Sequence, residues 1–201
     1  LCAEAAYATA NGTVSSADVS GSVSCTMKSV DIREVYSGGY ASGANAHASC
    51  GSITSSFAGS GNEVMIFHGG GDASNHACAD VSGSITANLT NCSSIYGYVT
   101  AGGTASGGGS ADVNGSVTLN VVNSVSPVQE QFGNLAAAAF HTGGQASGQG
   151  SSADVKGTCS LTLYKDSEIV GTSCGGGESI SGGSAKSGKI SFSLENVKGS
   201  E

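Results

Sequence analysis

The chain of 201 residues carries 15 acidic and 7 basic residues, a formal net charge of −8, and charged residues are only 11% of the total. It has 33 glycines, one proline and no tryptophan. This composition is unsuited to nucleic-acid binding, which needs clustered Lys and Arg. The sequence contains no run of about 18 apolar residues, so it predicts no transmembrane helix. Five of the basic residues lie in the last quarter, too scattered for a patch: Lys156, Lys165, Lys186, Lys189 and Lys198.

The first predicted elements define a repeating unit. Gly21 precedes an alternating run in which Val23, Cys25 and Met27 share one face and small polar residues share the other. A period of two with β-branched residues on one face predicts a half-buried strand. A second apolar stretch, 31–36, predicts a return strand, and a Gly-Gly pair follows at Gly38.

Later units repeat this order. The glycine before each alternating run, called the marker glycine below, recurs at steps of 30, 32, 32, 42 and 31 residues: Gly21, Gly51, Gly83, Gly115, Gly157 and Gly188. The Gly-Gly pairs recur at a nearly constant distance before the next of these glycines, beginning at Gly38, Gly69, Gly102, Gly143 and Gly175. The expected inner positions are Ile53, Ser55 and Phe57, then Ile85, Ala87 and Leu89, then Val117, Leu119 and Val121, then Cys159, Leu161 and Leu163, then Ile190, Phe192 and Leu194. Two markers in register indicate about six copies of one unit, and they argue against a disordered linker.

The unit is therefore a strand, a return strand and a glycine turn. We expect a single all-β repeat domain over 1–201, with units at roughly 9–39, 40–70, 71–103, 104–144, 145–176 and 177–196. The predicted fold is a repetitive β-meander of about six hairpin-like units, arranged as a sheet or as a two-layer β-arch or sandwich. One insertion, with the only proline, Pro127, accounts for the long step. The alternation also extends back from the marker glycines. Each of these glycines is therefore expected to be part of a long strand, a loop or a bend. A two-residue turn is disfavoured, because it would mix the apolar and polar faces of the strands on either side.

Seven cysteines point to an oxidising, extracytoplasmic setting and are disulfide candidates: Cys2, Cys25, Cys50, Cys78, Cys92, Cys159 and Cys174. The odd number leaves at least one that is free or bonded to another molecule. A first residue other than Met fits a mature secreted chain, although a missing start would read the same way. Four sequons are glycosylation candidates on an extracellular surface: Asn11, Asn88, Asn91 and Asn114.

No motif in the chain predicts catalysis. The four histidines, His47, His68, His76 and His141, have no carboxylate or serine partner at a recognisable spacing, and no hydrolase, zinc-protease or phosphate-loop pattern occurs. We therefore expect no enzyme activity, no catalytic residue and no cofactor.

Two groups of residues leave a metal open as an alternative. His47, Cys50, His76 and Cys78 could bind zinc, although a Cys50–Cys78 disulfide between adjacent units is the favoured interpretation. The aspartates of the recurring Ala-Asp-Val triplet could form a calcium row, a solvated face or turn caps: Asp18, Asp80, Asp112 and Asp154. If return strands lie between them, these carboxylates are about 10 Å apart.

The edges of the predicted sheet indicate how the protein works. Sheet proteins protect their edges with Lys, Pro or bulges, and this chain has few of either residue before position 156. Small and hydroxyl side chains at an open edge favour the addition of further copies. The pattern of Gly, Ser, Ala and Asn with cysteines resembles the tubular sheath protein of filamentous methanogenic archaea and related extracellular self-assembling β-proteins. This resemblance implies amyloid-like sheets locked by disulfides.

The expected function is that of a secreted structural subunit. It would self-assemble through β-sheet edges and disulfides into an extracellular sheath, filament or matrix at the cell surface, with itself as partner in a homopolymer. The alternative is a soluble β-repeat module that binds ice, calcium or glycan through its Ser, Thr and Asn rows.

Overall fold

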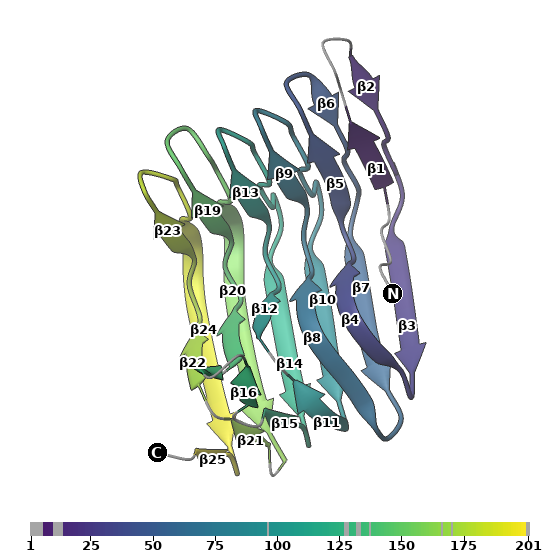
Figure 1. Ribbon diagram of the computed structural model, residues 1–201, viewed down its shortest axis with the longest axis vertical. Coiled ribbons are helices and arrows are strands. Elements are labelled where there is room, and N and C mark those ends of the chain that lie inside the picture. Colours follow the sequence, from purple (N-terminus) through teal and green to yellow (C-terminus); the bar gives the residue numbers. More distant parts are fainter. Residues whose placement is uncertain are drawn as a thin grey trace.

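The computed structural model describes residues 6–9, 14–95, 97–126, 129–131, 134–136, 138–165, 167–169 and 171–199. These residues form a flattened β-solenoid in which each repeat makes one coil and stacks against the next (Figure 1). Alternating apolar positions and glycine turns thus produce an all-β repeat fold, as the sequence predicts. The N- and C-terminal coils lie at opposite ends of the stack.

One wall of the solenoid is a six-stranded parallel sheet made of the strands that follow the marker glycines. Hydrogen-bonded partners repeat along the chain at the predicted steps, so that Val23, Ile53, Ile85, Val117, Cys159 and Ile190 stack in one column. The predicted inner rows and their alternation are confirmed in the first five strands, whereas Ile190, Phe192 and Leu194 of the last strand are in register but exposed. The strands are β3 (Val23–Lys28), β7 (Ile53–Ala58), β10 (Ile85–Thr90), β14 (Val117–Val122), β20 (Val155–Tyr164) and β24 (Ser187–Glu195).

The opposite wall consists of two further parallel sheets, one after the other along each coil. The return strands are β4 (Asp31–Tyr36), β8 (Asn62–His68), β11 (Cys92–Ile95), β12 (Tyr98–Thr100), β18 (Ala138–His141) and β22 (Gly171–Cys174). Beyond the glycine pairs, the short strands are β1 (Ala6–Thr9), β5 (Gly39–Ser42), β9 (Asp72–Ser74), β13 (Thr104–Ser106), β19 (Gln145–Ser147) and β23 (Glu178–Ile180).

Small sheets lie at the two turns of the coil. One turn carries β2 (Ser15–Ser16) and β6 (Ala46–His47), and the other carries β15 (Val125–Ser126), β21 (Glu168–Ile169) and β25 (Lys198–Gly199). The insertion forms a hairpin of β16 (Gln129–Gln131) and β17 (Asn134–Ala136), which is the one antiparallel pair among the described strands. Pro127 lies outside the described residues.

The predicted meander connectivity is wrong. A return strand does not pair with the strand before it, because it crosses to the opposite wall and pairs in parallel with the return strand of the next coil, as Val35 does with Phe67. The chain reverses at a left-handed residue, for example Asn91 (φ 54°) or Asn123 (φ 46°), and Asn tolerates that conformation better than most residues. A period of two reveals which face of a strand is buried, but not which strand lies beside it.

Four of the marker glycines, Gly21, Gly51, Gly83 and Gly115, are bends within one wall, whereas Gly157 and Gly188 lie inside β20 and β24. Gly115 has no left-handed φ, and its amide donates a hydrogen bond to the Gly83 carbonyl one coil away (2.9 Å). A Cβ on Gly115 would lie 2.5 Å from that same oxygen. Val113 and Val117, on either side of the bend, both enter the same core. The structure thus selects the bend among the alternatives that the sequence leaves open.

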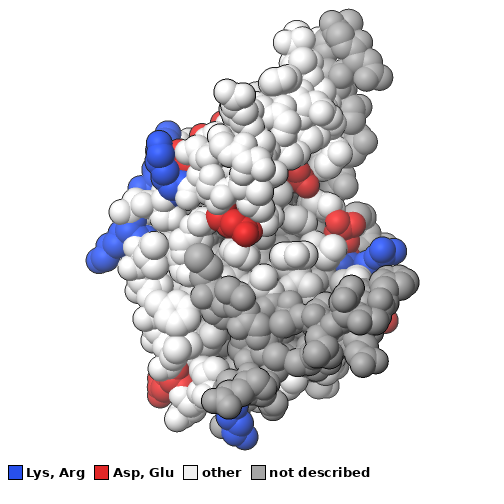
Figure 2. All heavy atoms as spheres, turned by 60° about the vertical axis from the view of Figure 1, so that its left-hand side comes forward, with Lys and Arg blue, Asp and Glu red and all other residues white. Residues whose placement is uncertain are grey.

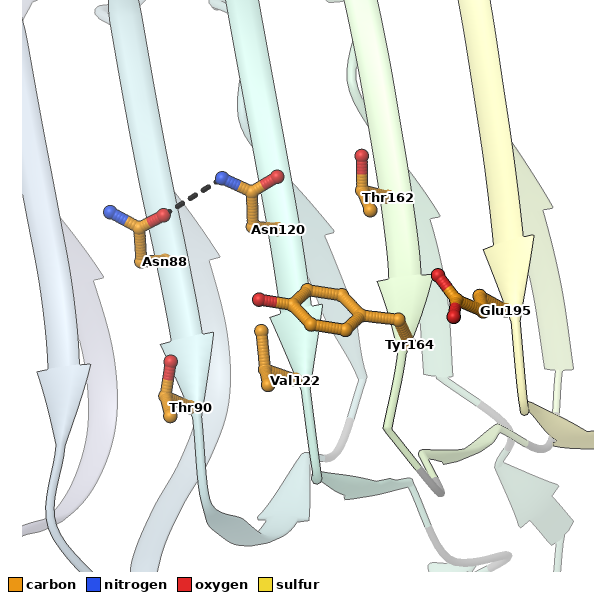
Figure 3. Close-up of a pocket in the computed structure, with 7 residues that line it drawn as sticks. All are labelled: Asn88, Thr90, Asn120, Val122, Thr162, Tyr164 and Glu195. Carbon is orange, nitrogen blue, oxygen red and sulfur yellow. Dashed lines mark hydrogen bonds between the residues drawn. The ribbon is translucent and has the colours of Figure 1, made fainter.

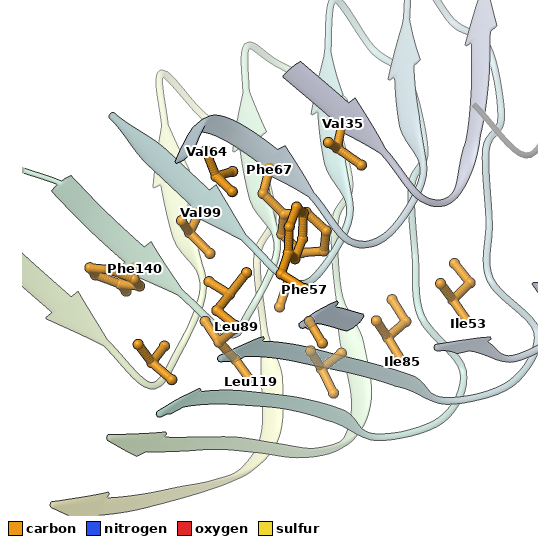
Figure 4. Packing of buried hydrophobic residues seen from close by; sticks show 14 of the residues in the cluster. Val35, Ile53, Phe57, Val64, Phe67, Ile85, Leu89, Val99, Leu119 and Phe140 are labelled. Carbon is orange, nitrogen blue, oxygen red and sulfur yellow. The ribbon is translucent and has the colours of Figure 1, made fainter. Parts of the chain in front are cut away.

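The interior is divided into two cores of different width. The wider core packs Val, Ile, Leu and Phe side chains between the long strands and the return strands, with Phe57 and Phe67 edge to face at its centre (ring centroids 5.8 Å apart; Figure 4). The narrower core lies between the short strands and the Ala-Asp-Val segments and consists of alanines alone: Ala41, Ala46, Ala48, Ala73, Ala77, Ala79, Ala105, Ala111, Ala146 and Ala153.

The glycine pairs mark the passage from one core to the other. A Cβ on Gly103 would lie 1.8 Å from the Ala111 carbonyl oxygen across the coil, and a Cβ on Gly71 would lie 1.7 Å from that of Ala79. The two walls approach so closely here that only glycine fits. The stacked column is Gly38, Gly70, Gly102, Gly143 and Gly176, so in the triplets that begin at Gly69 and Gly175 the middle residue, and not the predicted first one, is in register.

Candidate functional site: outer ladders and the open C-terminal coil

The aspartates of the Ala-Asp-Val triplets form a ladder on the outer surface. Asp112 Oδ1 accepts hydrogen bonds from the backbone N–H of Asp154 (2.7 Å) and from the Ser152 hydroxyl (2.7 Å), both in the next coil. Asp80 accepts the same pair from Asp112 and Ser110, and Asp154 accepts it from Lys186 and Ser184. The repeated Ser-Ala-Asp sequence therefore links each coil to its neighbour.

The expected spacing of about 10 Å between these carboxylates is wrong, because no return strand lies between them. Asp80 and Asp112 occupy adjacent coils in register, as the neighbouring Val81–Val113 bridge shows, which places them about 4.8 Å apart. At that distance like charges repel, and the N–H and hydroxyl donors offset the repulsion. One oxygen of each carboxylate is thus committed to linking coils, which favours the capping interpretation over a calcium row.

Asp18 begins this ladder at the N-terminal coil with a different set of partners. Its carboxylate accepts hydrogen bonds from Ser16, from both the N–H (3.0 Å) and the hydroxyl (2.8 Å) of Ser49, and it lies 2.8 Å from His47 Nδ1. The hydrogen bonds from Ser16 and Ser49 are the main reason why the pKa of Asp18 is well below its usual value. His47 is thereby engaged by Asp18.

The predicted zinc set and the predicted Cys50–Cys78 bridge are not assembled. Cys50 faces the core in the column of Val81, whereas Cys78 lies in the column of His47 and Ser110, with its Sγ 3.2 Å from Asp80 Oδ2. Both thiols are free. Within the described part of the chain, no three His, Cys, Asp or Glu residues gather in a way that could hold a metal ion.

The other described cysteines lie in the wider core or at its margin. Cys92 and Cys159 are buried in the wider core, and Cys25 is half-buried on β3. Burial raises the pKa of Cys92 to about 11, and burial together with Asp80 raises that of Cys78 to about 11. These thiols are therefore protonated near neutral pH and react slowly. The side chains of Cys2 and Cys174 lie outside the described residues.

The sequon asparagines occupy different environments. Asn88 lies in an amide ladder on the outer face of the long-strand wall, where it accepts a hydrogen bond from Asn120 Nδ2 (2.9 Å). Asn91 accepts one from Asn123 Nδ2 (2.8 Å) at the left-handed turn. Asn114 is exposed beside Lys156, and Asn11 lies outside the described residues. Glycosylation at these positions stays a prediction.

A shallow groove of about 450 Å³ crosses the same outer face near the C-terminal coil. Figure 3 shows the Tyr164 ring lying flat across the strands toward Val122, with the Asn88–Asn120 pair on one side and Glu195 on the other. An aromatic face among amides and a carboxylate is the kind of surface on which a polar ring ligand can stack. The groove belongs to the Ser, Thr and Asn rows, but the sequence carried no signal for it.

Two of the histidines lie in one column beside the glycine pairs. His68 stacks on Tyr36 (ring centroids 4.7 Å apart) and its Nδ1 is 3.0 Å from the Thr104 hydroxyl. His141 is buried, with its Nε2 4.0 Å from Glu178. Burial lowers the pKa of both, and Glu34 and Glu178 respectively oppose that effect. Parallel register places Thr100 between these two histidines, which are 32 and 41 positions away from it in the sequence, so no local motif could reveal the column.

The apolar row of the last described coil is exposed. Ile190, Phe192 and Leu194 continue the buried row of Cys159, Leu161 and Leu163, yet they are 55%, 46% and 56% exposed. Among the residues that the structure describes, no return strand follows β24 to cover them. Figure 2, turned toward this end, shows charged side chains of both signs scattered over a mostly uncharged surface.

In comparisons with known proteins, no family model, no curated protein and no solved structure matches the chain. Over the described ranges, none of the residues forms a helix long and apolar enough to span a membrane. The geometry of the molecule therefore carries the functional argument.

Proposed function

We propose that the protein is an extracellular structural subunit that self-assembles through the open edges of its solenoid into a sheath, filament or matrix. The observation that supports this most directly is the exposed apolar row of β24. Three large side chains, at positions that the internal coils bury, are left about half exposed, at a cost of about 1 kcal/mol for each side chain that could be buried instead.

The form of the molecule supports the same role. The backbone hydrogen bonds of its parallel sheets link each coil to the next, and the same pairing repeats along the stack. Both terminal strands of the long-strand sheet, β3 and β24, have an unpaired edge within the described structure. Such edges add further strands unless they are protected, which makes a surface that grows rather than a pocket that binds.

Disulfides between subunits, the second part of the proposal, are restricted by burial. Cys50, Cys92 and Cys159 lie in the core and cannot reach another molecule while the coil is folded. Of the described cysteines only Cys25 and Cys78 are partly exposed, so these are the thiols available for a covalent lock. The high cysteine content is the reason for placing the assembly outside the cell.

The test is electron microscopy of the purified chain at rising concentration, with and without a thiol reductant and heat. Ordered fibres or tubes support a structural subunit, and their release only on reduction supports disulfide locking. Dispersed monomers under all conditions contradict the proposal.

The second candidate function is a surface-binding module, and the groove beside Tyr164 is the observation that favours it. Of the ligands considered for such a module, a saccharide fits an aromatic face flanked by amides and a carboxylate better than calcium or ice. A glycan array with Tyr164→Ala as the matched variant would test it. Binding by the wild-type chain that the variant loses would favour this second function.

A further inference from the structure

The two ends of the solenoid have complementary strand edges. β24 presents one free edge of the long-strand sheet, β3 presents the other, and every internal step between them is a parallel pairing in register. An object built by repeating one step can be continued by the same step at its end. The edge of β24 is therefore already shaped to receive a strand like β3.

We propose that the C-terminal coil of one copy binds the N-terminal coil of a second copy head to tail, with β24 parallel to β3 of the next copy. This inference rests on the proposed function and identifies its partner, polarity and register. Continuing the column of inner residues places Ile190 beside Val23 of the next copy, Phe192 beside Cys25 and Leu194 beside Met27.

The apolar contact provides the driving force. Ile190, Phe192 and Leu194 are about half exposed, and Val23 and Cys25 at the opposite end are only partly buried. Internal neighbours in the same columns, such as Cys159 and Leu161, are at most 1% exposed. Adding a coil at the end should move the terminal row toward that internal state.

Opposite charges mark the same register. The ladder column that begins with Asp18 ends with Lys186, so stacking a second copy places Lys186 next to Asp18. Glu195 then lies beside Lys28 of the next copy. All four of these residues are exposed.

These two charge matches select the register rather than the strength of binding. Exposed ion pairs contribute little to affinity, but mismatched charges exclude wrong partners and fix alignment. A slip of two residues keeps the apolar side chains on the inner face, but it places Glu195 beside Thr26 and Lys186 beside Ser16. The apolar row alone would tolerate this slip, whereas the charges disfavour it.

A head-to-tail contact of this kind does not close on itself and produces an open filament. Each copy would add six coils, or an axial rise of about 29 Å, with the strands perpendicular to the filament axis. The filament would then be a continuous solenoid, and its diffraction would show the strand spacing of about 4.8 Å along the axis.

Charge reversal tests the register. Lys28→Glu and Glu195→Lys each oppose like charges at the joint, and the double variant restores an opposite pair. In a sedimentation assay at low salt, we expect each single variant to raise the critical concentration for assembly about fivefold and the double variant to return it close to the wild-type value. Glu63→Lys, the same charge change in an internal coil, is the matched control and should leave the critical concentration unchanged.

A cross-link tests the pairing without relying on energies. Ser193 and Thr26 face outward at matching positions, so a chain carrying Ser193→Cys and Thr26→Cys should give a ladder of covalent multimers with a short bifunctional maleimide. A chain carrying Ser193→Cys and Thr54→Cys should give no more than the wild-type chain, whose own cysteines set the background. Circular dichroism checks that all the variants fold.

The outcomes separate this inference from the proposed function. Rescue by the double variant together with the cross-linked ladder supports the head-to-tail joint. Polymers that form without charge dependence and without the ladder leave the structural function standing and overturn the register. A chain that forms no polymer at any concentration overturns both.

Discussion

The two halves of each coil solve the same packing problem in opposite ways. In the wider half, large side chains such as Phe57, Leu119 and Leu163 fill the space between the walls. In the narrower half the walls come so close that alanine fills the space, and at the glycine pairs nothing larger than hydrogen fits. We therefore expect the stability of the fold to fall when side chains in the wide half are made smaller and when side chains in the narrow half are made larger.

The largest effect is expected where the walls are closest. Gly103→Ala would place a Cβ 1.8 Å from the Ala111 carbonyl oxygen, so one wall must move, and we expect a loss of about 4 kcal/mol or more in the free energy of unfolding. Urea denaturation measures it. Gly21→Ala is the matched control, because its Cβ would meet no atom within 4 Å. Equal losses in both variants would contradict the account of the narrow half.

Removing volume from the wide half should have the next largest effect. Leu163→Ala creates a cavity at a position 2% exposed, and we expect a loss of about 3 kcal/mol in the free energy of unfolding. Leu194 is its neighbour in the same column but is 56% exposed, so Leu194→Ala should cost less than about 1 kcal/mol in the monomer. Both values come from urea denaturation at a concentration below that of assembly.

Adding the same two methyl groups to each half gives a direct comparison. Ala105 belongs to the narrow core and Ala87 to the wide core, where it lies between Ser55 and Leu119 in its column. We expect Ala105→Val to cost about 2 kcal/mol and Ala87→Val less than about 1 kcal/mol, because flexible neighbours in the wide core can repack. Melting temperatures of the pair measure the difference, and a larger loss at Ala87 would reverse the comparison.

A smaller effect is expected from pH at the boundary between the halves. Burial lowers the pKa of His68 and His141, so at pH values below about 6.5 the unfolded chain binds more protons than the folded chain. Stability that is complete above that pH should therefore fall as the solution becomes more acidic. Urea midpoints at pH 8 and pH 5 measure the fall.

The double variant His68→Gln/His141→Gln should reduce that pH dependence. His76→Gln, at an exposed turn, should leave it unchanged. A wild-type midpoint that is the same at both pH values would refute the assignment to these two histidines.

Much of the fold could be predicted from periodicity. Alternation after each marker glycine identified the apolar rows, and the glycine steps identified which residues are equivalent from one unit to the next, but that equivalent residues stack in one column follows only from the parallel pairing. The connectivity could not be predicted, since a return strand such as 31–36 has the same pattern whether it lies beside the preceding strand or across from it. The glycine pairs were noticed as a marker, but their reason, the approach of Gly103 to Ala111, exists only between walls.

The candidate site could be predicted from the sequence only in part. Recurrence of Asp in the Ala-Asp-Val triplet identified the ladder residues, and their bonds to the next coil follow from parallel register, which the sequence did not reveal. A Cys50–Cys78 bridge was expected because the two residues belong to adjacent units, whereas register separates them into different columns. The groove at Tyr164 and the His68–Tyr36 stack had no sequence signal, because each combines residues from different coils.

By itself, the sequence determined that the protein is an all-β repeat with one apolar face on each strand, since local alternation and glycine spacing are properties of the chain. Only the tertiary structure decided that the repeats stack in parallel as coils, that the interior divides into a wide and a narrow core, and that Ile190, Phe192 and Leu194 are left uncovered. The physical reason is that burial depends on which wall lies opposite a strand, and that choice is made by contacts between residues one coil apart.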